Sequence, residues 1–179
     1  GDGWTTAATG AARIGEAFDV IGNVVYRAAD DYEDGNGMTV PYSRYDVLGG
    51  LAKARFRPAD GHEITLGWVG NHDNWYESGT VQDVTLDENT FTGKYTFSTP
   101  DNPWIDLTVS GFHVDADQSQ TSQVDTIRFN PDNGQPVFVP AGSVRDFTLD
   151  TTGFDVWNSS AFEAWAFQHV VTIGGDWFR

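Results

Sequence analysis

The carboxylates of residues 30–34 form the densest group of side chains that could bind a ligand. The run Asp-Asp-Tyr-Glu-Asp is followed by Gly-Asn-Gly and offers enough oxygen atoms to coordinate Ca²⁺. It lacks the alternating ligand spacing and the distal glutamate of an EF-hand loop. We therefore interpret residues 30–37 as a solvated acidic loop and predict no metal site in the chain.

The other polar residues show no pattern typical of an enzyme. The remaining carboxylates are scattered, whereas glycoside hydrolysis requires two carboxyl groups held at a set separation. No serine lies in the strand-turn-helix elbow of a hydrolase. Cysteine is absent, which excludes disulfides and thiolate metal sites. We predict no catalytic residue and no enzymatic activity.

Four histidines are candidates for cargo contact, because histidine often holds haem iron. His62 and His169 lie next to predicted short turns, while His72 and His113 lie near the opposite strand ends and could face a cargo. Histidines without a ligand role are nevertheless more common. The cofactor-binding residues therefore stay unidentified, and we expect no bound cofactor in this segment.

Composition narrows the class of protein further. The net charge of -16 argues against nucleic acid and anionic lipid as partners, since both attract clustered lysine and arginine. Seven tryptophans and 14% aromatic residues fit either the interfacial girdles of a membrane barrel or the exposed platforms of a sugar-binding β-sandwich. No apolar run approaches the roughly 18 residues of a membrane helix, so any membrane crossing must use strands.

Long alternating strands are the elements that must position these residues. In residues 62–71, for example, Ile64 and Leu66 share one face, while Glu63 and Thr65 share the other. Such alternation is typical of strands with one face toward lipid and one toward a polar lumen. Strands are predicted at residues 4–14, 18–29, 43–57, 62–71, 91–98 and 104–114, and two more in the final hairpin, residues 145–179, around a turn at 162–166.

The connections alternate in length, which indicates how the strands follow one another. Short turns are predicted near residues 15, 59, 101 and 164, and long polar loops near 35, 80 and 130, the last two covering residues 71–89 and 115–143. Outer-membrane barrels have short periplasmic turns and long outer loops. The predicted fold is all-β: an antiparallel up-and-down meander of about eight long strands, forming an open part of a transmembrane β-barrel.

Three stretches of sequence resemble TonB-dependent outer-membrane receptors. They are RIGEAFDVIGNVVYR, AKARFRPADGHEITLGW and the final hairpin, in which GFDVWNSS and HVVTIGGDWFR are similar to paired strands of the haem and haemoglobin receptor subgroup. The resemblance implies that residues 1–179 form one partial barrel domain without the plug domain, cut at both ends from a barrel of about 22 strands. It also implies a location in the outer membrane.

The resemblance implies a transport function and a set of partners. Outer loops would capture haem, a haem protein or another iron compound, and the plug would reorganise under force from the TonB complex. Outer-membrane lipid would surround the wall, while the plug and the TonB complex would act through other parts of the chain. Haem is thus a possible transported ligand.

The ligand-binding residues of that family cannot be placed on this sequence. The family carries Phe-Arg-Ala-Pro and Asn-Pro-Asn-Leu boxes on either side of a haem-ligating histidine. Residues 56–59 read Phe-Arg-Pro-Ala, in scrambled order and at a short turn, and residues 130–133 read Asn-Pro-Asp-Asn, too far away along the chain. No family ligand residue is carried over.

Two other functions stay open at this point. A soluble β-sandwich that binds carbohydrate through exposed tryptophans would explain the aromatic content. A general porin or an autotransporter barrel would explain the strand pattern without energy coupling. Folding as a monomer in buffer without detergent would distinguish the β-sandwich from a membrane barrel. The sequence flanking this chain would distinguish a porin or an autotransporter from a TonB-dependent receptor.

Overall fold

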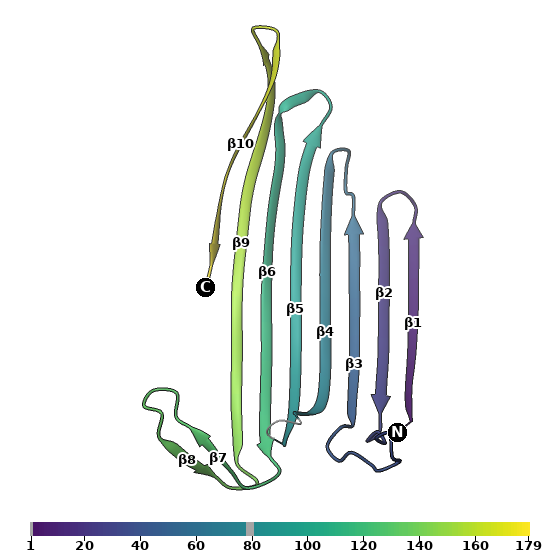
Figure 1. Cartoon of the computed structure of the whole chain (residues 1–179). Coiled ribbons are helices and arrows are strands. Elements are labelled where there is room, and N and C mark those ends of the chain that lie inside the picture. The colour runs from purple at the N-terminus through teal and green to yellow at the C-terminus, as the bar shows by residue number, and fades with distance from the viewer. Residues whose placement is uncertain (1, 78–80) are drawn as a thin grey trace.

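The chain folds as one extended antiparallel sheet with a small hairpin at one end (Figure 1). The computed structural model describes residues 2–77 and 81–179. Eight strands follow one another in the order β1-β2-β3-β4-β5-β6-β9-β10, and β7 and β8 pair separately. Their bounds are β1 Gly3–Ile14, β2 Phe18–Ala29, β3 Tyr45–Phe56, β4 His62–Glu77, β5 Gln82–Thr99, β6 Asn102–Ser122, β7 Thr126–Phe129, β8 Pro136–Val139, β9 Val144–Ala164 and β10 Phe167–Phe178.

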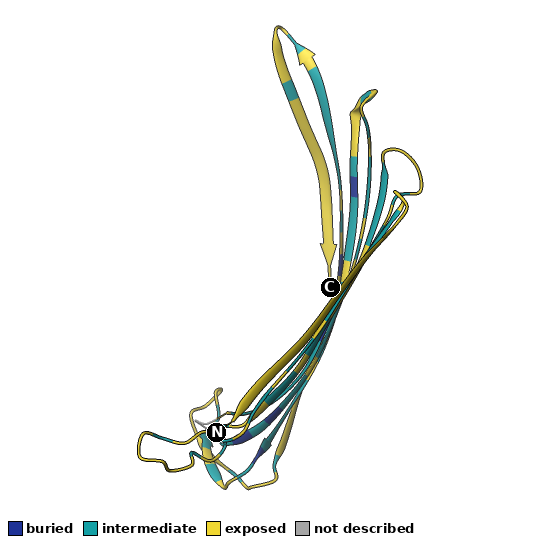
Figure 2. Ribbon diagram, turned by 90° about the vertical axis from the view of Figure 1, so that its right-hand side faces the viewer, coloured by how far each residue is buried: buried dark blue, intermediate teal, exposed yellow. Residues whose placement is uncertain are grey.

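The large sheet is open, as the sequence predicted. Strands β1 and β10 lie at opposite edges and, within the part of the chain that the structure describes, each pairs only with its neighbour in the meander. The described strands therefore do not close into an eight-stranded barrel. The β-sandwich interpretation is wrong, because the eight described strands form a single curved layer and the small β7–β8 sheet lies at one end of it (Figure 2).

The strand register gathers most large apolar side chains on one side of the sheet, which we call the apolar face, with Leu51, Val69 and Phe112 among the exceptions. Residues that pair directly across strands share a face, so one unbroken row crosses the whole sheet: Ile14, Phe18, Phe56, Ile64, Tyr95, Val109, Val156 and Gly175. The adjacent row lies on the opposite side, the polar face: Arg13, Asp19, Arg55, Thr65, Lys94, Ser110, Asp155 and Asp176. The predicted division of the strand faces is confirmed.

This sheet has almost no core of its own. Among the described residues, Val84 is the one buried hydrophobic side chain, while Leu66 is 58% exposed and Ile173 is 73% exposed. No described helix is long and apolar enough to cross a membrane. An apolar face this extensive requires a cover, because apolar surface left in water forfeits roughly 25 cal/mol for each Å².

Two predicted loops are largely strand, and these predictions were wrong. Residues 71–89 were expected to form a polar loop, but β4 continues to Glu77 and β5 begins at Gln82, while residues 78–80 lie outside the described part. Residues 115–143 were expected to be irregular, but β6 continues to Ser122 and the β7–β8 hairpin occupies much of the remainder. In β4 and β6, polar side chains lie on both faces of the extension, which weakens the alternation that reveals a strand. In β5, Val84 and Leu86 do alternate with polar residues, and this signal was missed.

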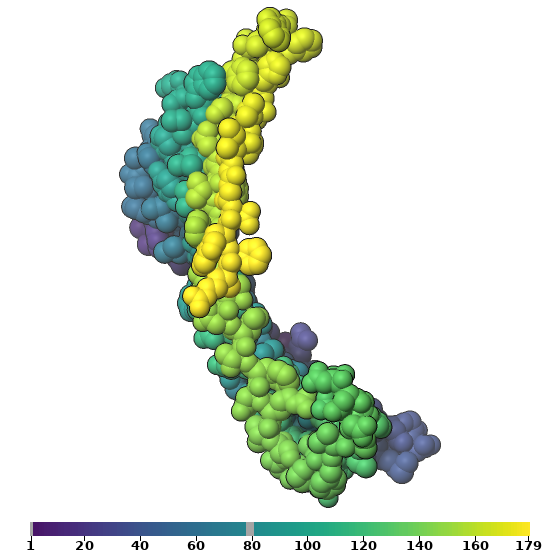
Figure 3. Space-filling model, turned by 90° about the vertical axis from the view of Figure 1, so that its left-hand side faces the viewer, coloured from purple at the N-terminus to yellow at the C-terminus, as the bar shows by residue number. Residues whose placement is uncertain are grey.

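The short turns lie at one end of the sheet and the longer connections at the other (Figure 1). The final turn is tighter than predicted, because β9 reaches Ala164 and only Trp165 and Ala166 separate it from β10. At the other end, the β7–β8 hairpin and the loop between β2 and β3 bulge toward the same, concave side of the sheet (Figures 2 and 3).

Candidate functional site

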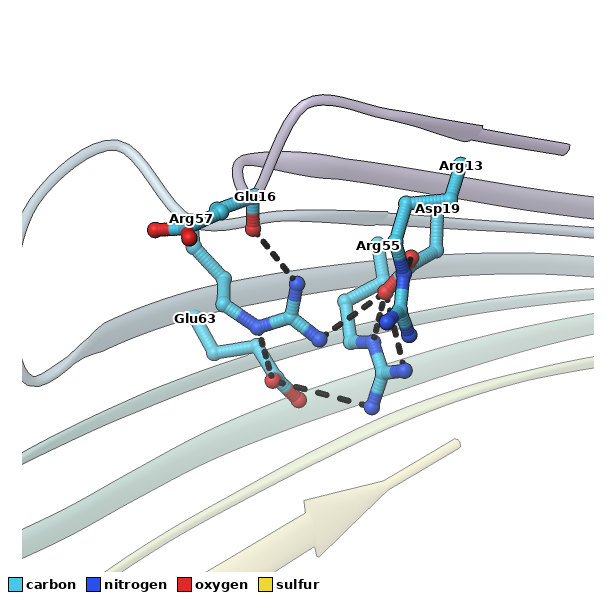
Figure 4. A network of polar contacts seen from close by, with 6 residues as sticks. All are labelled: Arg13, Glu16, Asp19, Arg55, Arg57 and Glu63. Atoms are coloured by element: carbon cyan, nitrogen blue, oxygen red, sulfur yellow. Dashed lines mark hydrogen bonds and ion pairs between the residues drawn. The ribbon is translucent and has the colours of Figure 1, made fainter.

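A cluster of charged side chains lies on the polar face of β1 to β4, close to the short turns (Figure 4). Arg13, Asp19 and Arg55 are direct partners on β1, β2 and β3, so their side chains must project from the same face. Arg57 directly follows the end of β3, and Glu63 is the second residue of β4. Antiparallel register thus brings together residues that are far apart in the sequence.

Two carboxylates bridge three arginines in this cluster. Asp19 contacts Arg13 Nε at 2.6 Å through Oδ1, and Arg55 Nη2 and Arg57 Nη2 at 2.9 Å each through Oδ2. Glu63 Oε2 lies 3.3 Å from Arg57 Nε and 3.8 Å from Arg55 Nη1. Arg57 also donates from Nη1 to the backbone carbonyl of Glu16 at 3.0 Å. The network therefore ties four strands together beside two of the short turns.

The polar face carries an excess of positive charge here, although the chain as a whole is acidic. Three guanidinium groups share two carboxylates, and the neighbouring Lys53 and Lys94 have no ion-pair partner among the described residues. A hollow in this face is lined by Ala11, Arg13, Asp19, Lys53, Arg55, Glu63 and Thr65. Such a surface attracts anionic groups. The described residues contain no group of three or more histidine, aspartate or glutamate side chains that could hold a metal ion.

The four histidines are separated and none of them joins this cluster. His62 receives or donates a hydrogen bond with the Tyr95 hydroxyl at 2.7 Å, and His169 stacks on Phe162 at 5.3 Å. Both lie beside short turns, as predicted. The structure aligns His72 with Leu48, and His113 with Phe91, on the side of the apolar face.

These positions mean that neither His72 nor His113 lines the polar face. His72 Nδ1 instead lies 2.5 Å from Asp87 Oδ1, and His113 Nδ1 lies 2.9 Å from Thr152 Oγ1. Both rings have neighbours on adjacent strands at the same face. Their contact with a cargo, suggested by their place near the ends of the longer connections, stays a prediction.

The β7–β8 hairpin presents a second candidate surface at the end of the longer connections. Ile127 pairs with Phe138, and Phe129 pairs with Pro136, so these four residues share one face of the hairpin. Ile127, Phe129 and Phe138 are 63%, 71% and 63% exposed. Residues 115–150 around the hairpin contain six aspartates but only two arginines. An exposed apolar face thus stands in acidic surroundings, which suits a partly apolar ligand.

The loop between β2 and β3 is organised by two aspartates. Asp31 Oδ1 accepts hydrogen bonds from the backbone N–H groups of Ser43 at 2.8 Å and Arg44 at 2.9 Å. Asp34 Oδ1 accepts from those of Asn36 at 2.8 Å and Met38 at 2.9 Å. The N–H of Ser43 lowers the pKa of Asp31, and the N–H of Met38 lowers the pKa of Asp34. These two carboxylates thus fix the shape of the loop through its backbone.

The sequence alone does not show how the charges of the polar face connect. The positive residues of β3 follow from alternation alone, whereas the contact between Arg13 and Arg57 through Asp19 depends on register across three strands. The hairpin was missed because its strands have four residues each. Two short apolar runs on either side of the turn at Asn130-Pro131-Asp132-Asn133-Gly134 could have indicated this hairpin.

Comparisons with known proteins agree with this geometry. No family model matches the chain. The TonB-dependent heme receptor A of Haemophilus influenzae (strain 86-028NP) is 25% identical over 181 residues, which cover 86% of this chain and 23% of that receptor. The crystal structure of the outer membrane transporter YddB from Escherichia coli superposes on 98% of this chain with a TM-score of 0.62 and 12% identity, and is matched over 25% of its length.

The chain therefore spans about a quarter of the length of each protein it matches. Its eight-stranded open sheet has the fold of part of the wall of an outer-membrane β-barrel. The match to a named receptor supports the resemblance to TonB-dependent receptors that the final hairpin indicated.

Proposed function

We propose that this segment of an outer-membrane, TonB-dependent receptor barrel serves the active uptake of haem or another iron compound, supplying barrel wall and part of the outer capture surface. The open sheet supports the proposed role as barrel wall, because its apolar face is suited to contact lipid and its polar face to line a lumen. The haem receptor among the matched proteins supports the choice of cargo. The role is transport, with no catalytic step.

The β7–β8 hairpin is the part of this segment that would contact the cargo. Its exposed Phe129 and Phe138 offer aromatic surface to a flat apolar molecule such as haem, or to an apolar patch on a haem protein. The plug domain and the TonB complex would act through parts of the receptor outside these residues.

Growth of cells on haem as the sole iron source tests the energy-coupled function. Cells that carry the full-length receptor should grow, and cells that lack either the receptor or TonB should not. A general porin or an autotransporter predicts uptake that does not depend on TonB. TonB-independent growth, with the receptor as the sole route for haem, would therefore contradict the proposal.

The contribution of the hairpin is tested by the double substitution Phe129→Ser/Phe138→Ser in the full-length receptor. Loss of an exposed aromatic anchor costs roughly 1–2 kcal/mol, so haem or haem-protein binding to cells should weaken by about tenfold or more. Thr126→Ser, on the opposite face of the same hairpin, is the matched control and should bind normally. If both variants bind equally well at equal amounts of receptor on the cell surface, the hairpin does not contribute to capture of the cargo.

A further inference from the structure

A hollow of about 420 Å³ lies across β2 to β5, at the end of the sheet that has the longer connections (Figure 1). Volumes of roughly 300–1,000 Å³ are typical of small-molecule sites. Asn74 lies six residues beyond Trp68 on β4, which is roughly 20 Å along the strand, so the hollow is outside the apolar rows. On the side of the apolar face it is lined by Tyr26, Asp46, Asn74, Tyr76, Asp83 and Thr85.

Hydrogen bonds fix the polar side chains of this hollow. Asp46, Asn74 and Thr85 are direct partners on β3, β4 and β5. Asn74 Nδ2 donates to Asp46 Oδ2 at 3.3 Å, and Thr85 Oγ1 donates to Asn74 Oδ1 at 2.8 Å. The Asn74 amide is oriented further by His72 Nε2, which lies 3.0 Å from Nδ2. The other oxygen of the Asp46 carboxylate, Oδ1, has no hydrogen-bond partner among the described residues and can accept one from a ligand.

Two tyrosines give the hollow aromatic walls. Arg44 Nη2 donates to the Tyr76 hydroxyl at 2.8 Å, and the guanidinium carbon lies 5.1 Å from the centre of the ring. The Tyr42 ring meets Tyr76 at 5.3 Å and 64°, from a residue whose φ of 64° is uncommon for a bulky side chain. Tyr26 lines the hollow from β2, where its ring packs against Trp4 at 4.9 Å. Both walls are therefore held in place before any ligand arrives.

The charges and polar groups of the hollow narrow the class of ligand. Asp30, Asp46 and Asp83 outnumber Arg44, so carboxylates and phosphates are repelled. An acyl chain would strip water from these groups without replacing the lost hydrogen bonds. The hydroxyl groups of a sugar form strong hydrogen bonds to carboxylates, and the C–H face of its ring packs on an aromatic side chain. A neutral sugar thus matches both the polar and the aromatic walls.

We propose that this hollow binds a neutral saccharide on the outer rim of the receptor. Asp46 Oδ1 accepts a hydrogen bond from one sugar hydroxyl, while Tyr26 and Tyr76 pack against the C–H face of the ring. Two sources offer this chemistry: the sugars of the lipopolysaccharide around the barrel, and soluble glycans in the medium. The inference rests on the outer-membrane orientation in the proposed function, and not on the identity of the cargo.

Binding of maltotriose, chitotriose and pentalysine to the full-length receptor, purified in detergent and freed of lipopolysaccharide, tests the site. Saturation-transfer NMR titrations compare the natural receptor with Asp46→Ala and Tyr76→Ala, which each remove one wall. Asp146→Ala is the matched control, because Asp146 lies on the same face and in the same row, Asp46-Asn74-Thr85-Ser119-Asp146, but does not line the hollow. Tyr76→Phe keeps the aromatic ring if Tyr76→Ala does not fold.

At least one trisaccharide should bind, and its affinity should fall tenfold or more in Asp46→Ala and in Tyr76→Ala. It should change less than twofold in Asp146→Ala and less than threefold in Tyr76→Phe. Asp46→Asn should weaken binding by threefold at most, because an amide still bonds to a hydroxyl. An equal loss in Asp146→Ala would overturn the proposal. Binding of pentalysine alone, abolished by Asp46→Asn, would also overturn it and would assign the hollow to a cationic peptide.

Competition distinguishes the two sources of the sugar. Lipopolysaccharide with a complete core should displace the trisaccharide if the site binds the surrounding glycolipid, whereas lipopolysaccharide without core sugars should not. A trisaccharide that stays bound in the presence of both forms indicates a soluble glycan. If neither trisaccharide nor the complete lipopolysaccharide binds, the proposal is wrong. None of these probes contains iron, so failure here is distinct from failure of growth on haem.

Discussion

At the scale of single residues, Asp31 and Asp34 give the loop between β2 and β3 its shape. Each carboxylate accepts two backbone N–H bonds from residues further along the loop, and these bonds lower both pKa values. A carboxylate with a lowered pKa stabilises the folded loop in its ionised form. The loop should therefore loosen when the aspartates are protonated.

We expect the order of residues 30–44 to depend on pH in one direction. The stabilisation is fully present above the pKa of an ordinary aspartate, about 3.9, and is lost as the pH falls through the lower folded-state values. Hydrogen exchange of the detergent-solubilised receptor, corrected for intrinsic rates, should show protected loop amides at pH 7 and exposed ones near pH 2. Asp31→Asn should loosen the loop at pH 7, and unchanged protection in that variant would contradict this role.

The two strand faces should respond differently to a charged substitution at adjacent positions. Ile173→Arg places a charge on the apolar face and should destabilise the protein in lipid by roughly 2–4 kcal/mol if the residue is near the bilayer midplane. Thr172→Arg, on the polar face, should have a small effect. Thr65 is a poorer control, since an arginine there would lie between Arg55 and Lys94. Equal losses at positions 172 and 173, measured by equilibrium unfolding in lipid vesicles, would contradict the assignment of faces.

At the scale of elements, the extensions of β4, β5 and β6 distinguish this sheet from the predicted one. The sequence predicts a strand well wherever lipid and lumen impose opposite polarity, as at Leu66 and Thr65. Beyond the membrane this requirement ends, and a run such as His72, Asp73 and Asn74 is polar on both faces. What keeps these segments extended is pairing with the neighbouring strand, and a single sequence carries no signal of that pairing.

Protease accessibility should reflect the strand extensions. On whole cells that carry the full-length receptor, we expect cleavage within residues 123–143, at the turns that flank β7 and β8. Residues 115–122 should resist, because they belong to β6 and pair on both sides, with β5 and β9. Cleavage confined to residues 58–61 would show that the orientation in the membrane is inverted.

In the charged cluster, alternation predicts on which face a residue lies, but it does not predict which residues it contacts. Alternation alone placed Arg55 and Lys53 on the polar face. The role of Asp19 as the centre of three arginine contacts could not be predicted, because it requires the register of β1 against β2 and of β2 against β3. Register is set by turn geometry and by the burial of one face.

At the scale of the whole molecule, the sheet exposes far more surface than a globular protein. Its accessible surface is 12252 Å², whereas a compact protein of this mass exposes about 8,600 Å². The long, thin shape is plain in the space-filling view (Figure 3). The missing burial must come from lipid on the apolar face and from the rest of the barrel at the edges and the polar face.

Residues 1–179 prepared alone should therefore not form a stable membrane protein or a soluble monomer. In a bilayer, the free edges of β1 and β10 would leave N–H and C=O groups unpaired, and each such group costs several kcal/mol in hydrocarbon. In water, the same edges invite pairing between copies, and the apolar face promotes it. Light scattering in detergent-free buffer should detect aggregates, and flotation with phospholipid vesicles should recover little inserted, protease-resistant protein. The full-length receptor under the same refolding conditions is the control, since closure of its barrel removes both edges. A monodisperse monomer in buffer would contradict the interpretation of this sheet as part of a barrel wall. Such a monomer would have to bury its apolar face and protect both of its edge strands without any partner.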